Sequence, residues 1–138
     1  ALTWLGSVAP TTLEVDSGAN AALGYYATQA ADPTTFAWNA TDSRPADDVS
    51  GNIDSNGMDK SGNTVRYVIQ RMCRSSGIAG SDNCLFGAPV AGGSSQVVKD
   101  ATGACGSCTS TAQSTMYRIT ARVTSSKNTV SYIQAFVY

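Results

Sequence analysis

The sequence predicts a single α+β domain in which a short N-terminal helix precedes antiparallel strands joined by long loops. Three observations predict this class. The pattern of residues 1–9 is typical of the end of a helix, and residues 65–72 are rich in β-branched and aromatic side chains. Apolar and polar side chains alternate in residues 116–138, on both sides of one turn. A length of 138 residues is typical of one domain, and neither a repeat nor a linker divides the chain. We therefore expect one unit over residues 1–138.

The helix comes first in the chain and is short. Leu2 and Leu5 fall on one face of it, and Gly6, with a proline soon after, is typical of a helix end. Farther along, residues 39–62 and 77–106 contain few large apolar side chains. We expect these two stretches to be long surface loops.

The strands follow from side-chain alternation. The first is expected over residues 65–72. In the C-terminal segment one face carries Tyr117, Ile119, Ala121 and Val123, and the other carries Arg118, Thr120 and Arg122. Residues 124–128 then turn the chain, and residues 129–138 return as a second strand. This pattern predicts an antiparallel hairpin with one buried and one wetted face.

A partial calcium-loop pattern lies in the first long loop. Asn52, Asp54 and Asn56 occupy alternate positions before a glycine, as the oxygen ligands of such a loop do. The last ligand position falls on Asn63, which cannot supply a bidentate carboxylate. Asn56 followed by Gly57 is also a strong signal for a hairpin turn. We favour the turn, keep calcium as the alternative and expect no other cofactor or metal.

The composition excludes several classes of function. Charged residues make up 14% of the chain, the net charge is −1 and no basic run is present, so nucleic acid is not an expected partner. The chain contains no histidine, which excludes Ser-His-Asp and Cys-His catalysis and histidine-bound zinc or haem. The acidic residues are scattered, with no pattern that pairs two of them in a cleft. We expect no enzyme.

Aromatic side chains are the remaining binding candidates. Those considered for contact with a sugar or a partner are Tyr25, Tyr26, Trp38 and Tyr138. A place in the core is the competing interpretation, and we favour it for Trp38 and Tyr67, because small domains bury most of their large aromatic side chains.

The four cysteines are Cys73, Cys84, Cys105 and Cys108, which allow three disulfide pairings. Only the last two have the spacing of a zinc knuckle, so a four-thiolate zinc site, free thiols and a redox pair stay as alternatives. We expect two disulfides and favour Cys73–Cys84 and Cys105–Cys108, because each closes a local loop. Disulfides persist in the periplasm or outside the cell, so we expect an exported protein.

Several of these segments resemble one family. Residues 62–73 (GNTVRYVIQRMC) look like the central strand of PilX-type minor pilins of bacterial type IV pili. Residues 117–123 (YRITARV) and 128–134 (NTVSYIQ) are similar to the closing hairpin of that family. Residues 22–26 and 33–38 add shorter similarities.

The resemblance implies an architecture. Type IV pilins carry a long N-terminal helix that anchors in the inner membrane through its first half and lies against an antiparallel sheet through its second half, and disulfides tie their C-terminal loops. Residues 1–9 would be the tail of that helix, and the leader and the apolar segment would precede it. The implied fold is a type IV pilin-like α+β domain with a truncated helix and long disulfide-tied loops.

The resemblance also implies a function: an assembly subunit that joins other minor pilins, primes polymerisation of the major pilin and sits at the fibre tip, where a tip adhesin is a further expected partner. It implies a location in the inner membrane and periplasm before assembly and in the extracellular pilus afterwards, with membrane contact only through the preceding helix. Two alternatives stay open, an adhesin-type binding module that uses its long loops and a minor pseudopilin of a type II secretion system.

Overall fold

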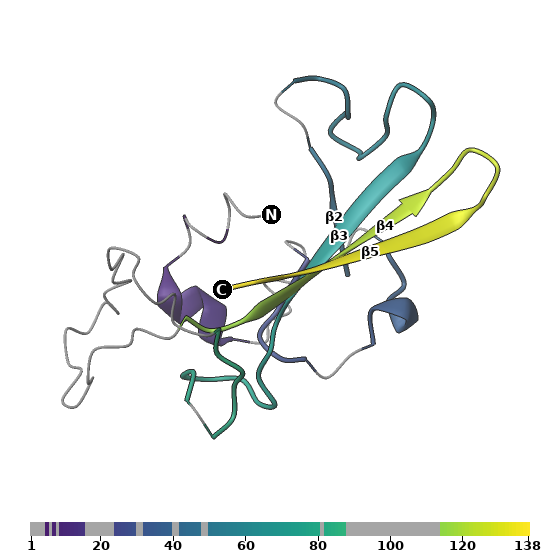
Figure 1. Cartoon of the computed structure of the whole chain (residues 1–138). Coiled ribbons are helices and arrows are strands. Elements are labelled where there is room, and N and C mark those ends of the chain that lie inside the picture. Colours follow the sequence, from purple (N-terminus) through teal and green to yellow (C-terminus); the bar gives the residue numbers. More distant parts are fainter. Residues whose placement is uncertain are drawn as a thin grey trace.

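The computed structural model describes residues 5, 7, 9–15, 24–29, 32–39, 42–47, 50–80, 82–87 and 114–138, which form one mixed sheet of five strands (Figure 1). The strands are β1 (Tyr25–Tyr26), β2 (Arg44–Pro45), β3 (Thr64–Arg71), β4 (Tyr117–Thr124) and β5 (Val130–Val137), with 3-10 helices η1 (Pro10–Glu14) and η3 (Pro33–Thr35) before β1 and β2. The three long strands are eight residues each and run antiparallel to their neighbours, in the order β3-β4-β5.

The predicted central strand and C-terminal hairpin are confirmed. β3 begins and ends one residue before the predicted limits, and β4 and β5 pair from Tyr117 opposite Val137 to Thr124 opposite Val130. A turn over residues 125–129 joins them, closed by hydrogen bonds between the backbones of Ser125, Asn128 and Thr129. β-Branched and aromatic side chains dominate these strands because they pack well on a pleated surface.

The helical part of the prediction is not matched among the described residues. Of residues 1–9, the structure describes Leu5, Ser7 and Ala9, and the first two are helical. The described ranges otherwise contain only the short 3-10 helices η1 and η3. They therefore show a sheet with almost no helix, so the described residues confirm the sheet of the predicted α+β class and not its helix.

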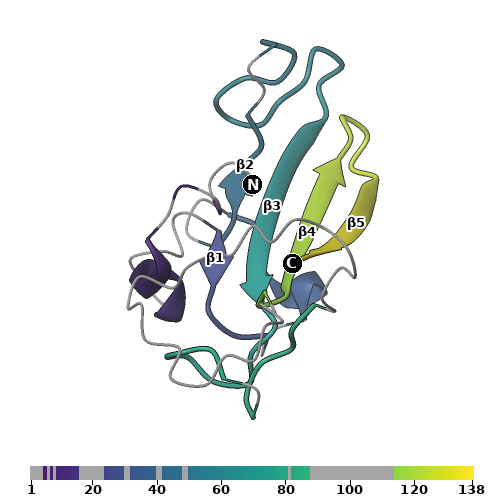
Figure 2. The ribbon, with the colours of Figure 1, turned by 60° about the vertical axis from the view of Figure 1, so that its left-hand side comes forward.

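The sheet is mixed, which corrects the expectation of a purely antiparallel one. β1 and β2 both pair with the edge of β3 that faces away from β4 (Figure 2). β2 is antiparallel to β3, whereas β1, opposite Ile69 and Gln70, is parallel to it. The chain reverses direction between β1 and β2, so one of these strands runs parallel to β3 and the other runs antiparallel to it.

One face of the sheet holds the core, and we call it the core face. Its buried cluster consists of Tyr25, Ala27, Tyr67 and Ile69, and the partly buried side chains packed against it are Leu5, Leu13, Ala46, Tyr117, Ile119 and Ala121. Leu5 and Leu13 come from the N-terminal segment, so this segment covers the core face above β3 and β4. The predicted core position of Tyr67 is confirmed.

The opposite face carries three arginines in register, and we call it the arginine face. Arg66 on β3 lies opposite Arg122 on β4, and Arg118 lies opposite Gln70. The segment around η3 contacts this face, because the Trp38 ring lies 5.8 Å from that of Tyr132 on β5. Trp38 is 5% exposed, which confirms its predicted burial.

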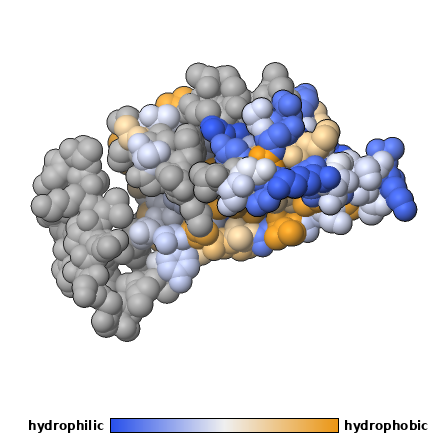
Figure 3. Space-filling model, turned by 90° about the horizontal axis from the view of Figure 1, so that it is seen from above, coloured by the Kyte–Doolittle hydropathy of each residue, from blue (hydrophilic) through white to orange (hydrophobic). Residues whose placement is uncertain are grey.

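Burial does not follow the predicted division into one buried and one wetted face. Thr120, expected on the wetted side, is fully buried, because the sheet is covered on both faces at β3 and β4. β5 is exposed along its first seven residues, whichever face they occupy. The space-filling view shows hydrophilic side chains at the end that carries the β4–β5 turn and hydrophobic ones along the middle (Figure 3).

No helix within the described ranges is long and apolar enough to cross a bilayer.

Candidate functional site

The first candidate region is the loop closed by a disulfide. Cys73 and Cys84 are bonded, which confirms the predicted pairing of these two residues. Cys105 and Cys108 lie outside the described residues, so their pairing stays a prediction. The bond connects residues directly after β3 to the segment that pairs through Phe86 with Thr115 before β4. It therefore ties together the ends of the two central strands.

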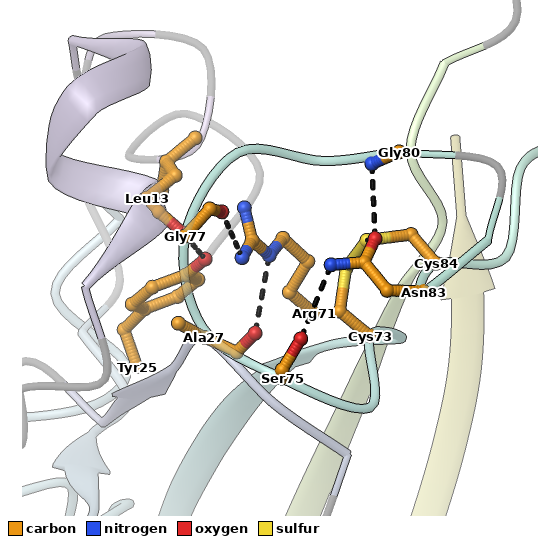
Figure 4. The surroundings of a disulfide bond; sticks show 10 residues. All are labelled: Leu13, Tyr25, Ala27, Arg71, Cys73, Ser75, Gly77, Gly80, Asn83 and Cys84. Carbon is orange, nitrogen blue, oxygen red and sulfur yellow. Dashed lines mark hydrogen bonds between the residues drawn. A yellow bond between two sulfur atoms is a disulfide. The ribbon is translucent and has the colours of Figure 1, made fainter.

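A buried arginine holds this loop against the sheet (Figure 4). Arg71 is 2% exposed, and its guanidinium donates to the carbonyl oxygens of Ala27, at 3.1 Å, and Gly77, at 2.7 Å. Asn83 adds hydrogen bonds inside the loop, to Ser75 Oγ and from Gly80 N. These contacts link the loop to the chain after β1 in a defined conformation.

The disulfide-closed loop presents mixed chemistry. Ile78 at its tip is 78% exposed. A shallow pocket of about 310 Å³ lies beside the disulfide and is lined by Gln29, Met72, Arg74, Asp82, Asn83, Cys84 and Leu85. Since one cation and one anion line it together with apolar groups, it favours no single class of ligand.

The predicted calcium residues lie in a pair of consecutive turns. Asp54 Oδ1 accepts hydrogen bonds from the amides of Asn56 and Met58, at 2.9 and 2.8 Å. The Asn52 side-chain oxygen accepts from Lys60 Nζ at 3.3 Å. The described residues include no group of three histidine, cysteine, aspartate or glutamate side chains that could hold a metal ion. The calcium alternative stays untested.

The second turn repeats the first five residues later. Asp59 Oδ1 accepts from the amides of Ser61 and Asn63, and its other oxygen accepts from the Asn63 side chain at 2.7 Å. These hydrogen bonds hold the pKa of Asp59 below its usual value. Gly57 and Gly62 occupy equivalent places in the two turns, both with positive φ. Only one turn was predicted here, and the repeat was missed, although the sequence shows it as Asp-x-x-Gly-x twice in succession.

Two tyrosines and a second aspartate among the described side chains have shifted pKa values. Burial raises the pKa of Tyr67 and of Tyr117, so both phenols stay protonated near neutral pH. Hydrogen bonds from Thr34 lower the pKa of Asp32, the direction opposite to that required of a general acid.

The arginine face has an uneven set of partners. Arg66 is held by Ser43 Oγ, at 2.6 Å, and by the Asn39 carbonyl oxygen, at 3.0 Å, and burial lowers its pKa. Arg118 donates twice to Gln70 Oε1, at 3.0 and 2.6 Å. Arg122 Nε is buried and has no hydrogen-bond partner among the described residues. Two arginines are thus opposite each other, and the Nε atom of one of them has no hydrogen-bond partner in the described part of the chain.

Most of the predicted aromatic candidates are not available at the surface. Tyr25 is fully buried, and its hydroxyl donates to the Leu13 carbonyl oxygen. The Tyr26 hydroxyl donates to the carbonyl oxygen of Asp42. Only Tyr138, of the four, is exposed.

The exposed apolar side chains are instead concentrated on β5. Those more than one third exposed there are Val130, Tyr132, Ile133 and Phe136. They were not among the candidates predicted from the sequence. The available signal was a strand of the predicted hairpin without a charged residue.

Comparison with known proteins found no family model, no curated protein and no solved structure that matches this chain. The candidate surface is therefore defined by its own geometry: the β5 edge, the arginine face beside it and the disulfide-closed loop.

Proposed function

We propose that this chain is the globular domain of a PilX-type minor pilin, a structural subunit that helps to prime assembly of a type IV pilus. The observation that carries the proposal is the packing of helical Leu5 on the core face of the sheet, against the cluster of Tyr25, Tyr67 and Ile69. In the resembled family the N-terminal helix lies on an antiparallel sheet in this way.

Two further features support the proposal. The segments that resemble the family, residues 62–73, 117–123 and 128–134, form the central strand and most of the closing hairpin. The Cys73–Cys84 disulfide fits an exported protein. The α+β architecture with its long helix, the fibre location and the pilin partners all belong to this proposal.

The experiment is made in the source cells. Intact mass and N-terminal sequencing of the native protein should reveal a mature chain that continues upstream of Ala1 for about 20 or more mostly apolar residues. A native chain that starts near Ala1 after an ordinary signal peptide would refute the proposal.

Deletion of the gene gives the second readout. The deletion should lower the number of surface pili, and expression of the full-length protein in trans should restore it. Normal pilus number with lost attachment would instead identify an adhesin-type module, and lost protein secretion with normal pili would identify a pseudopilin. Either result would refute the assembly function.

A further inference from the structure

The outer edge of β5 is unpaired within the part of the chain that the structure describes. β5 is the last strand in the sheet order, and no strand among the described residues pairs with its outer side. It has eight residues, from Val130 to Val137. Proteins usually protect such an edge with a charged side chain, a proline or a bulge, because an open edge recruits further strands. β5 contains no charged residue and no proline, and its register with β4 has no bulge.

The register identifies the free backbone groups. Ser125 N donates to Thr129 O at the hairpin end, so residues 125 and 129 form a hydrogen-bonded pair. Hydrogen-bonded and non-hydrogen-bonded pairs alternate along an antiparallel ladder. Ser131, Ile133 and Ala135 therefore direct their amides to β4. The amides that point outward, toward an incoming strand, are those of Val130, Tyr132, Gln134 and Phe136.

The side chains beside this edge have different chemistry on the two faces. On the core face, Ile133 is 64% exposed and offers an apolar contact. On the arginine face, Tyr132 lies opposite Arg122 and Phe136 lies opposite Arg118. An added strand would thus meet apolar groups on one side, and aromatic rings with cations behind them on the other.

The arginine face concentrates positive charge near β5, from Arg66, Arg118 and Arg122. The charge of Arg118 already acts on one carboxylate, that of Asp32. Arg122 faces Arg66 across the ladder, and like charges directly opposite destabilise a sheet. An incoming strand would lie two strand spacings from β4, about 10 Å. Extended arginine and glutamate side chains can meet across that distance.

We infer that the β5 edge accepts an extended segment of another protein, in which apolar side chains toward the core face alternate with acidic side chains toward the arginine face. Its backbone would bond to Val130, Tyr132, Gln134 and Phe136, and its carboxylates would lie near Arg118 and Arg122. A second copy of this chain fits less well, because residues 130–137 contain no acidic side chain and two joined copies would bring together the positive charges of two arginine faces.

This inference names the subunit contact of the proposed assembly function and rests on that function for its biological role. The two can fail separately. Capture of an acidic strand in solution, combined with normal pilus number in the deletion strain, would refute the assembly function and keep the strand-accepting edge. Loss of pili in the deletion strain without capture of an acidic strand in solution would keep the assembly function and refute the strand-accepting edge.

The experiment uses the whole chain, labelled with nitrogen-15, and a synthetic peptide of alternating valine and glutamate with blocked ends. Peptide binding should slow hydrogen exchange at the amides of Tyr132, Gln134 and Phe136, whereas Ile133 and Ala135, already bonded to β4, should change little. A matched peptide with lysine in place of glutamate should bind about ten-fold more weakly, and added salt should weaken only the glutamate peptide.

Two variants and one control sharpen the test. Gln134→Pro removes an outward amide and leaves the β4 ladder intact, so it should abolish binding while the β4 amides stay protected. Arg122→Gln should weaken binding of the glutamate peptide about three-fold. Arg74→Gln makes the same change of charge in the disulfide-closed loop and should leave binding unchanged.

Four results would overturn the inference. They are equal binding of both peptides, no binding at any soluble peptide concentration, protection without the alternation along β5, and concentration-dependent protection of the same amides by the chain itself. The last result would identify a second copy as the occupant.

Discussion

β3 and β5 are both eight-residue strands with similar contents of β-branched and aromatic residues, yet their surroundings are opposite. β3 carries two arginines and is buried over its last five residues, Tyr67 to Arg71. β5 carries no charge and is exposed over its first seven. The charged strand lies in the middle of the sheet and the uncharged one lies at its edge.

The difference shows that the burial of a strand here depends on its partners more than on its composition. β3 has β1 and β2 on one edge and β4 on the other, and carbonyl oxygens satisfy the buried guanidinium of Arg71. β5 has one neighbour among the described strands. Its exposed apolar groups are not needed to fill the core, which leaves them available for contact with another chain.

The largest expected effect compares one isoleucine from each strand. Ile69→Ala on β3 should lower the free energy of unfolding by about 3–4 kcal/mol, because it leaves a cavity among fully buried side chains. Ile133→Ala on β5 should lower it by about 0.5 kcal/mol or less, because that side chain is already in solvent. Urea denaturation of both variants measures the contrast. Equal losses would show that β5 is packed as β3 is.

The next effect concerns the covalent tie at the end of β3. Replacement of Cys73 and Cys84 by alanine should cost about 3 kcal/mol, since the disulfide closes a short loop in the unfolded chain. Thermal unfolding of the double variant measures this loss, with the exposed Ser76→Ala as the control inside the same loop. A loss confined to the loop, without a change in the global transition, would contradict it.

A smaller effect concerns the turn that leads into β3. Gly57 has a φ of 84° and lies against the Val65 carbonyl oxygen and Pro45, so Gly57→Ala should cost about 2 kcal/mol. Gly51 has a φ of 70° but open space around it, and Gly51→Ala should cost about 1 kcal/mol. Chemical denaturation compares the two. If both cost the same, the contact with β3 has no energetic role.

The smallest effect depends on pH. The folded-state pKa of Asp59 lies below its unfolded value, so its stabilising contribution is present above about pH 4 and is lost as pH falls through the folded pKa. Asp59→Asn should lose less stability on acidification than the wild type does. Denaturation midpoints at neutral and acidic pH measure the difference, with Asp82→Asn as the control. Identical acid sensitivity in all three proteins would refute the assignment.

The sequence predicted the long strands because their pattern is local. Alternation of side chains and a polar turn are sufficient for β3 and for the β4–β5 hairpin, and the proximity of Cys73 to Cys84 favoured their disulfide. The parallel pairing of β1 was not predictable, since two residues carry no period and their direction depends on the reversal before β2.

The candidate surface was harder to predict than the strands. Whether an aromatic side chain such as Tyr25 or Phe136 is buried depends on sheet order, which no local pattern states. The burial of Thr120 likewise depends on its place in the middle of the sheet, between β3 and β5. The partners of Arg66 on the arginine face, Ser43 and Asn39, are distant in sequence and could not be predicted for the same reason.

The paired turns before β3 have a consequence for how this protein can change in length. Ile53 pairs with Asp59 across the first turn, and Met58 pairs with Thr64 across the second. In each five-residue unit the backbone therefore turns back to pair near the point where the unit begins. The aspartate of the unit accepts hydrogen bonds from the backbone amides of the turn. Insertion or loss of one whole unit should preserve the register of β3, whereas a change of another length would require the turns to rearrange. Related chains should therefore differ here in steps of five residues.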